Sequence, residues 1–328
     1  MAKDYFIVEY EGHITSPEIF EEVAYFPGVR RFAHTQFFRG VTGETMAQYK
    51  AREAAESVGA PKDPVDRAIW ELDRSGVDVA FVIPERFGFV SDNAKPLQSN
   101  GWLIKTCARY PDRLFPAPNF HPTRRGLDEA IWEMEYFAKN QNCKFFKLYP
   151  PDETRRMDDE WMFPFYAKAQ ELGLTMGIHT GLGYVYGGST ENCHPGQLEK
   201  ICHKFYDLKI VAFHFGWPWH HELNALANTY PNLYVGMSYQ NRAIKFRPRW
   251  FSELLGEALL WAGPDKVIWS QDGITDLKDS IDAFRTFQFA DDLRAGYGYP
   301  LLTEEDKAKI FGLNFAKLIG MEPRKRTA

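Results

Sequence analysis

The sequence has few cysteines, no long apolar run and little net charge, and each of these absences excludes a class of protein. Four cysteines in 328 residues, with no CxxC pair among them, exclude a disulfide framework and a cysteine-ligated zinc site. No run approaches the ~20 apolar residues that span a bilayer, and the N-terminal residues lack the apolar stretch of a signal peptide. We therefore expect a cytoplasmic protein with reduced thiols and no membrane partner.

The balance of charges argues against a nucleic-acid partner. The chain carries 39 basic and 44 acidic residues along its whole length, for a net charge of −5. No basic block is interleaved with aromatic residues, so we expect no nucleic-acid surface. Aromatic residues make up 16% of the chain and include nine tryptophans. Such a content fits a well-filled barrel or an apolar interface, so a homo- or hetero-oligomer is one expectation.

Eight short apolar runs recur along the chain, and stretches with helical spacing of apolar residues lie between them. Strands that alternate with helices predict parallel βα units, and eight such units predict a (β/α)8 TIM barrel of the α/β class. We assign residues 1–328 to a single domain of this kind. The expected strands are 5–11, 77–84, 114–120, 144–149, 174–179, 208–214, 233–238 and 267–272. The expected helices are 64–74, 127–138, 163–171, 197–205 and 303–320.

Two segments depart from the regular βα pattern. The expected strand 114–120 contains two prolines, which cannot donate to a strand ladder, so it is the weakest of the eight. Residues 26–61 are long and polar, and they follow the first strand. We interpret 26–61 as an insertion over the barrel mouth, where it serves as a lid or a subunit contact.

Polar residues of metal-ligand types end five of the eight apolar runs. Each of them alone has an ordinary structural reading, such as a strand-end turn or a buried ion pair. In (β/α)8 enzymes, however, the reacting residues gather at the carboxyl ends of the strands, so these side chains are expected to meet at one metal site. The residues are Glu11 and His13 on the first run, Lys147 on the fourth, His179 on the fifth, His214 on the sixth and Asp272 on the eighth.

These motifs, in this order and spacing, resemble those of the amidohydrolase superfamily. The resemblance covers most of the chain and is closest to the branch of metal-dependent hydrolases that also contains aromatic-acid decarboxylases. The family begins with His-x-His or Glu-x-His. The matching segments are Glu11-Gly12-His13, Phe146-Lys147-Leu148-Tyr149, Ile178-His179-Thr180-Gly181, His214-Phe215-Gly216-Trp217, Ser270-Gln271-Asp272 and Asn314-Phe315-Ala316-Lys317-Leu318.

The resemblance implies roles for these residues. Glu11, His13 and Asp272 would hold one divalent metal, while His179 and His214 would hold a second metal or orient the substrate. Asp272 would move the proton in catalysis, with His214 beside it as a second catalytic residue. Lys147 matches a lysine that some binuclear relatives carboxylate into a bridging carbamate; the alternative is an unmodified lysine that binds a substrate carboxylate.

The expected ligands restrict the identity of the metal and of the substrate without fixing either one. Mixed carboxylate and imidazole ligands suit manganese, iron or zinc, in one or two copies. A small carboxylate-bearing molecule is the expected substrate. His194, Tyr184 and Trp217 are candidates for binding it, although each could equally serve a surface turn or the core.

Four functions are compatible with the sequence. The first is hydrolysis by metal-activated water. The second is O2-dependent hydroxylation at a manganese–iron or di-iron centre, as in the related 2-aminoisobutyrate hydroxylase pair. The third is non-oxidative decarboxylation; here His179 is followed by Thr180 where those enzymes usually carry proline, and Lys147 has no counterpart in them. The fourth is a non-catalytic subunit that supports a partner.

Overall fold

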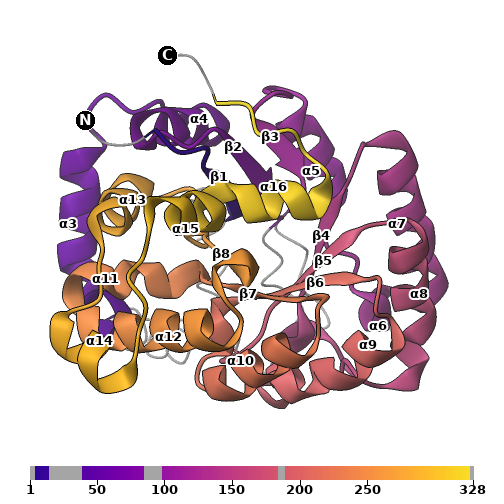
Figure 1. Cartoon of the computed structure of the whole chain (residues 1–328). Coiled ribbons are helices and arrows are strands. Elements are labelled where there is room, and N and C mark those ends of the chain that lie inside the picture. Colours follow the sequence, from indigo (N-terminus) through magenta and orange to yellow (C-terminus); the bar gives the residue numbers. More distant parts are fainter. Residues whose placement is uncertain (1–3, 15–38, 85–97, 184–188, 326–328) are drawn as a thin grey trace.

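The computed structural model describes residues 4–14, 39–84, 98–183 and 189–325. Within these ranges, short parallel strands form the centre of the molecule and helices surround them (Figure 1). The strands pair in sequence order, β1-β2-β3 in one sheet and β4 to β8 in another. They are β1 (Val8–Gly12), β2 (Val79–Val82), β3 (Leu114–Pro116), β4 (Phe145–Leu148), β5 (Thr175–Ile178), β6 (Lys209–Ala212), β7 (Leu233–Gly236) and β8 (Val267–Ile268).

The helices follow the strands in the alternating order expected of a (β/α)8 barrel. The α-helices are α3 (Met46–Glu56), α4 (Pro64–Ser75), α5 (Asn100–Cys107), α6 (Pro122–Arg125), α7 (Leu127–Asn140), α8 (Phe163–Glu171), α9 (Leu198–Lys204), α10 (His220–Thr229), α11 (Ala243–Phe246), α12 (Pro248–Trp261), α13 (Leu277–Thr286), α14 (Asp291–Tyr297), α15 (Glu304–Ala308) and α16 (Asn314–Ile319). The 3-10 turns are η1 (Pro150–Asp152), η2 (Glu160–Met162), η3 (Glu191–Cys193), η4 (Pro195–Gln197), η5 (His214–Gly216), η6 (Ser238–Arg242) and η7 (Pro264–Lys266), and η8 (Lys309–Leu313) is a π-helical turn.

Aromatic rings fill the space inside the strands. Tyr10 packs against Phe145, Phe213 and Phe315, with ring centroids 5.1–6.1 Å apart. Gly236 faces Tyr10 directly, and a Cβ at that position would collide with the tyrosine hydroxyl, so the close approach requires glycine. The interior is therefore a packed core and not a pore, as in other barrels of this class.

Helix α16 covers the end of the barrel from which the strands start. Its Phe315 lies within 5.0–5.2 Å of the rings of Tyr10, Phe81 and Phe145, and it belongs to the same buried cluster as Phe6. Figure 1 shows α16 lying across the strands while the other helices lie around them. With that end covered, the carboxyl ends of the strands form the opposite end of the barrel.

Backbone hydrogen bonds join the two sheets. Between β3 and β4, the Lys147 amide donates to the Pro118 carbonyl at 3.0 Å, and Asn119 pairs with Lys147 in a parallel bridge. Between β8 and β1, the Gly273 amide donates to the Glu11 carbonyl at 2.8 Å. Both of these connections lie at the carboxyl ends of the strands, so they fix the end that carries the polar residues.

All eight expected strands are confirmed, each within a few residues of its expected bounds. The expected helices are confirmed too, with one difference in 303–320. Thr303 caps α15 and Gly320 ends α16 with a φ of +67°, but the π-helical turn η8 separates these two helices. The Ile310 carbonyl accepts a hydrogen bond from the Trp269 amide at 2.9 Å, so contact with the end of β8 accompanies the irregular turn.

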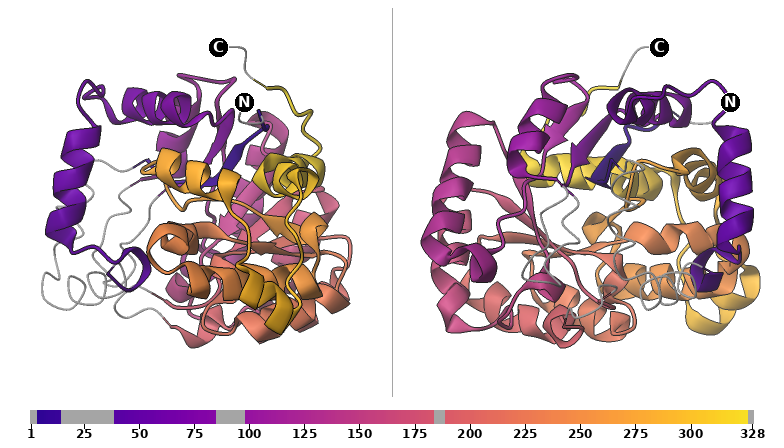
Figure 2. Two further views of the ribbon diagram at one scale, coloured as in Figure 1. Left: turned by 60° about the vertical axis from the view of Figure 1, so that its left-hand side comes forward. Right: turned by 180° about the vertical axis from the view of Figure 1, so that it is seen from behind.

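The insertion expected at 26–61 is described only in part, because 26–38 lie outside the described residues. Its remainder includes α3, which lies at the edge of the molecule far from α7 and α8 (Figures 1 and 2). All four cysteines are buried and free. In the part of the chain that the structure describes, no helix is both long and apolar enough to cross a membrane.

Candidate metal centre

An irregularity in β1 points Glu11 into the barrel. Glu9 pairs with Ala80 and Gly12 with Val82, so β1 contains one residue more than β2 over the same length. A bulge of this kind re-aims a side chain. As a result the consecutive residues Tyr10 and Glu11 both face inward: Tyr10 meets the aromatic core, and Glu11 meets Lys147 from β4.

Glu11 is fully buried and lies among polar side chains. The Lys147 Nζ donates to Glu11 Oε1 at 2.6 Å, and the Ser238 hydroxyl donates to Oε2. His214 Nε2 lies 3.7 Å from Oε1. Burial raises the pKa of the Glu11 carboxyl, and the Lys147 ammonium partly opposes this effect. The single ammonium is therefore the main positive charge that stabilises this carboxylate inside the barrel.

His13 offers an imidazole lone pair to a carboxylate. Its Nδ1 lies 3.1 Å from the Ile83 carbonyl, which can only accept, so Nδ1 carries the proton. Its Nε2 therefore carries the lone pair, and it lies 3.5 Å from Asp272 Oδ1. Burial also holds the pKa of His13 well below its usual value, so the ring is neutral. A lone pair that faces a carboxylate, with the other ring nitrogen bonded to a backbone carbonyl, is the usual arrangement of a metal-ligating histidine.

Asp272 lies at the end of the β8 segment in an uncommon backbone conformation, with a φ of +64°. Burial and the nearby Glu11 raise the pKa of the Asp272 carboxyl to about 7. The side chains of Lys147 and Arg242 act in the opposite direction. A carboxyl whose pKa lies near neutrality can both accept and return a proton under physiological conditions.

His179 and His214 form a pair next to Glu11. The Nε2 of His179 lies 3.0 Å from the Leu182 carbonyl, so Nε2 donates and Nδ1 accepts. The His214 Nε2 lies 2.9 Å from that Nδ1, and the two ring centroids are 4.4 Å apart. Burial lowers the pKa of His179 to about 3 and that of His214 well below its usual value. Both rings are therefore neutral near pH 7.

The described residues fit a divalent cation. Ligand atoms of Glu11, His214 and Asp272 all lie within 4.8 Å of one another. His13 adjoins this group through Asp272, and His179 adjoins it through His214. Two carboxylates with neutral imidazoles form a mixed oxygen and nitrogen donor set, which suits manganese, iron or zinc. The structure thus brings all six expected metal-site residues into one connected cluster.

The residues expected to bind substrate have other contacts. His194 lies 3.3 Å from Glu222, and its ring lies 4.6 Å from that of Trp219. Trp217 packs edge-on against Trp250 at 5.9 Å. None of these side-chain contacts involves the metal-site cluster. Tyr184 lies outside the described residues, so its role and those of His194 and Trp217 remain predictions.

Glu9 was not predicted from the sequence as a site residue. It joins the two segments that carry Glu11 and Asp272. Glu9 is fully buried; it accepts hydrogen bonds from the Glu11 amide at 3.1 Å, the Gln271 amide at 2.8 Å and the Ser270 hydroxyl. Burial raises the pKa of Glu9 to about 7. A charged residue inside the first apolar run was the signal that could have identified it.

Two residues from η6 were also missed. Ser238 bonds to Glu11, and Arg242 donates to the Gln271 carbonyl next to Asp272. Ser238 ends the seventh apolar run, in the same position that identified the other site residues, so its place could have been read from the sequence. Arg242 lies four residues further on, inside a turn, and carried no such signal.

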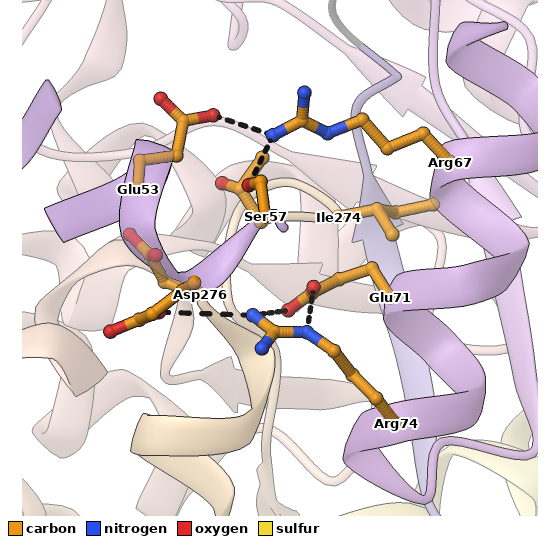
Figure 3. Close-up of a pocket in the computed structure, with 9 residues that line it drawn as sticks. Glu53, Ser57, Arg67, Glu71, Arg74, Ile274 and Asp276 are labelled. Atoms are coloured by element: carbon orange, nitrogen blue, oxygen red, sulfur yellow. Dashed lines mark hydrogen bonds and ion pairs between the residues drawn. The ribbon is translucent and has the colours of Figure 1, made fainter. Parts of the chain in front are cut away.

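A charged pocket lies beside the loop that follows Asp272. Figure 3 shows it between α3, α4 and the residues Ile274 and Asp276. Its charges pair with one another: Arg67 bonds to Glu53 at 3.1 Å and Arg74 bonds to Glu71. Arg52 of α3 reaches Asp276 at 3.1 Å. This network therefore fastens α3 to the loop that begins at Asp272.

The affinity of the site for a divalent cation is expected to rise as the pH passes through about 7. Below that value the Asp272 carboxyl holds a proton that the cation must displace, whereas the neutral imidazoles hold none. We expect Mn²⁺ to bind at least about tenfold more weakly at about pH 6 than at about pH 8. Titration calorimetry at the two values tests this, with Asp272→Asn expected to reduce the difference. Equal affinity at both values would contradict the prediction.

Comparisons with known proteins identify the family of the chain and support its fold. A family model described as amidohydrolase matches residues 32–321. No curated protein matches the chain. An uncharacterised TIM-barrel protein from Bordetella bronchiseptica shares the fold with a TM-score of 0.69 and 19% identity, over 96% of this chain and 98% of that one.

Two further solved structures of similar fold carry functional descriptions. A dihydroxybenzoic acid decarboxylase from Polaromonas sp. JS666, with bound manganese and the inhibitor 2-nitroresorcinol, has a TM-score of 0.63 and 14% identity, over 96% of this chain and 97% of that one. A probable 2-pyrone-4,6-dicarboxylic acid hydrolase from Acinetobacter baumannii, with citric acid bound, has a TM-score of 0.58 and 15% identity, over 96% and 99%. At these identities the likeness establishes the fold.

Proposed function

Because the chain belongs to the amidohydrolase family of metal-dependent enzymes, we propose that it hydrolyses a small carboxylate-bearing substrate at a divalent metal centre. The observation that carries this proposal is the group of Glu11, His214 and Asp272, whose ligand atoms lie within 4.8 Å of one another. In that group the Asp272 carboxyl has a pKa of about 7, which suits a proton acceptor.

The metal would be held by Glu11, His13 and Asp272, with His214 and its partner His179 next to them. When bound, a divalent cation lowers the pKa of a water ligand towards neutrality and polarises a substrate carbonyl. Asp272 accepts the proton of the attacking water and returns it to the leaving group. His214, held by its hydrogen bond to His179, lies on the Glu11 side of the site, where it can orient the reacting carbonyl.

Lys147 is compatible with two kinds of site: one with two metal ions, or one that binds an anionic substrate. Its side chain is 3% exposed, and its Nζ lies over the rings of Tyr149 and Phe213 at 4.9 and 5.1 Å. A lysine beside two cations would be suited to carbamate formation, which would bridge a metal pair. An unmodified ammonium would instead pair with a substrate carboxylate. Both readings place the reacting substrate next to Glu11.

Decarboxylation is the second candidate. One solved structure of similar fold is a dihydroxybenzoic acid decarboxylase with bound manganese. In addition, an ammonium group beside a metal would hold the carboxylate that leaves as CO2. Against it stand Thr180 and Lys147, which depart from the pattern of those enzymes. Hydroxylation with O2 and a non-catalytic role stay as predictions from the sequence, because no contact described above favours them.

The fate of the oxygen and carbon atoms separates these reactions. We would incubate the manganese-loaded protein with a panel of small aromatic and aliphatic esters, lactones and amides that carry a free carboxylate, in ¹⁸O-labelled water. Hydrolysis predicts one ¹⁸O atom in the product acid and no release of CO2. Release of CO2 without ¹⁸O in the remaining product would replace the proposal with decarboxylation, and consumption of O2 would replace it with hydroxylation.

A further inference from the structure

Two adjacent histidines begin α10, close to the end of the barrel at which β6 ends. His220 and His221 face α12, which packs against α10 at the lower edge of the molecule in Figure 1. On α12, Glu253 and Glu257 lie one turn apart. Among the described residues, no hydrogen bond, ion pair or ring contact joins these four residues to the six-residue cluster at the metal centre. The group is therefore a separate feature of the surface.

The side chains of His220, His221 and Glu253 offer three ligand atoms, all within 4.8 Å of one another. Ligands around a tetrahedral zinc ion lie about 3.3 Å from one another, given bonds of about 2.0–2.1 Å. The observed separations therefore need only a small rotation of exposed side chains to reach that geometry. The exposed His221 ring already lies over that of His220, with centroids 4.2 Å apart.

The hydrogen bond of His220 leaves its second nitrogen available to a metal. Nδ1 lies 3.2 Å from the Pro218 carbonyl, which can only accept, so Nδ1 carries the proton and Nε2 the lone pair. Nε2 is buried and has no hydrogen-bond partner among the described residues. Burial and His221 also lower the pKa of His220, which favours the neutral ring. A ring nitrogen prepared in this way is typical of metal-ligating histidines.

Glu257 supplies the second carboxylate near the group. It accepts hydrogen bonds from the Tyr299 hydroxyl and from the Trp261 indole, both at 3.2 Å, so its position is fixed. Its Oε2 lies 3.9 Å from His221 Nδ1. This distance is too long for a hydrogen bond, so the Glu257 carboxylate adds negative charge beside the group but does not fix the His221 ring. Two carboxylates and two imidazoles then balance the charge of a divalent cation.

We propose that His220, His221 and Glu253 form a second metal site, which binds a divalent transition metal of the zinc class between α10 and α12. Two imidazoles and one carboxylate suit zinc, cobalt or nickel better than calcium or magnesium. The site is independent of the metal centre at the barrel mouth. A practical consequence is that metal analysis of the intact protein overcounts the metals at the catalytic centre by this one ion.

Zinc stoichiometry in matched variants tests the proposal. The full-length manganese-loaded protein would be equilibrated with Zn²⁺, freed of unbound metal and analysed for zinc, alongside His221→Ala, Glu253→Gln and the control His203→Ala, which removes an exposed histidine from α9. We expect the unmodified protein and the control to hold one more zinc per chain than the first two variants. Because only the difference is scored, exchange of metal at the barrel mouth does not affect the result.

Cobalt gives a second readout. Co²⁺ bound to nitrogen and oxygen ligands absorbs visible light, so the unmodified protein should gain a band that His221→Ala and Glu253→Gln lack. Equal zinc content in all four proteins, or identical cobalt spectra, would overturn the proposal. Neither measurement uses catalytic activity, so the result does not depend on which reaction the barrel mouth performs.

Discussion

Replacing Asp272 with alanine is expected to abolish turnover while leaving the fold intact. Asp272 is the proposed proton acceptor, and its carboxyl has a pKa of about 7 beside Glu11. Loss of a positioned acid–base group typically lowers a rate by about 10²–10⁴-fold, and here the variant also loses a proposed metal ligand. The measurement is kcat on the substrate found by the ¹⁸O screen, with metal content determined on the same sample.

Asp279→Ala is a matched control for this variant. Asp279 lies on α13, and its exposed carboxylate pairs with Lys245 at 2.6 Å. Removing it deletes the same side chain close in the sequence without touching the cluster, so kcat should stay unchanged. Circular dichroism and Tm would establish that both variants fold. Turnover retained by Asp272→Ala would remove the assigned role of that residue.

Replacing Lys147 with methionine is expected to destabilise the metal-free protein by about 3–5 kcal/mol, because it leaves a buried carboxylate without its partner. Glu11 is fully buried, and its Oε1 lies 2.6 Å from Lys147 Nζ. Methionine keeps most of the volume of the lysine chain, so the main change is the lost charge. The free energy of unfolding, measured with urea in the presence of a chelator, gives the effect.

Added Mn²⁺ should recover part of this stability, because a cation at the proposed site replaces the lost ammonium beside Glu11. Lys245→Met is the control: its pair with Asp279 is exposed, so the change should cost no more than about 1 kcal/mol and should not respond to Mn²⁺. A loss at Lys147 no larger than that of the control would show that Glu11 does not depend on the lysine charge.

Much of the fold could be read from the sequence because its signals are local. The apolar runs and the helical spacing between them predicted all eight strands, and Thr303 and Gly320 correctly bounded the last helical stretch. The π-helical turn within that stretch was not predictable. It accompanies a contact between the Ile310 carbonyl and the Trp269 amide, which lie 41 positions apart in the chain.

The metal-ligand candidates of the site were predictable from the sequence, whereas its geometry and the partners Glu9, Ser238 and Arg242 were not predicted. Polar residues at strand ends marked Glu11, Lys147, His179, His214 and Asp272, because parallel strands in a barrel place their carboxyl ends together. The hydrogen bonds that set the roles could not be read in this way. The hydrogen bond between His13 and Ile83 joins residues 70 positions apart in the sequence. The hydrogen bonds of Glu9 with Ser270 and Gln271 join residues more than 260 positions apart.

The sequence by itself determined the (β/α)8 architecture and the residues that meet at one end of it, since both follow from the periodicity of side chains along short segments. Only the tertiary structure decided that a bulge points Glu11 at Lys147, that Asp272 faces the lone pair of His13, and that Glu9 joins the first strand to the last. These features depend on the register between neighbouring strands. Register is set by the packing of segments that are distant in the chain, and that packing leaves no local pattern to read.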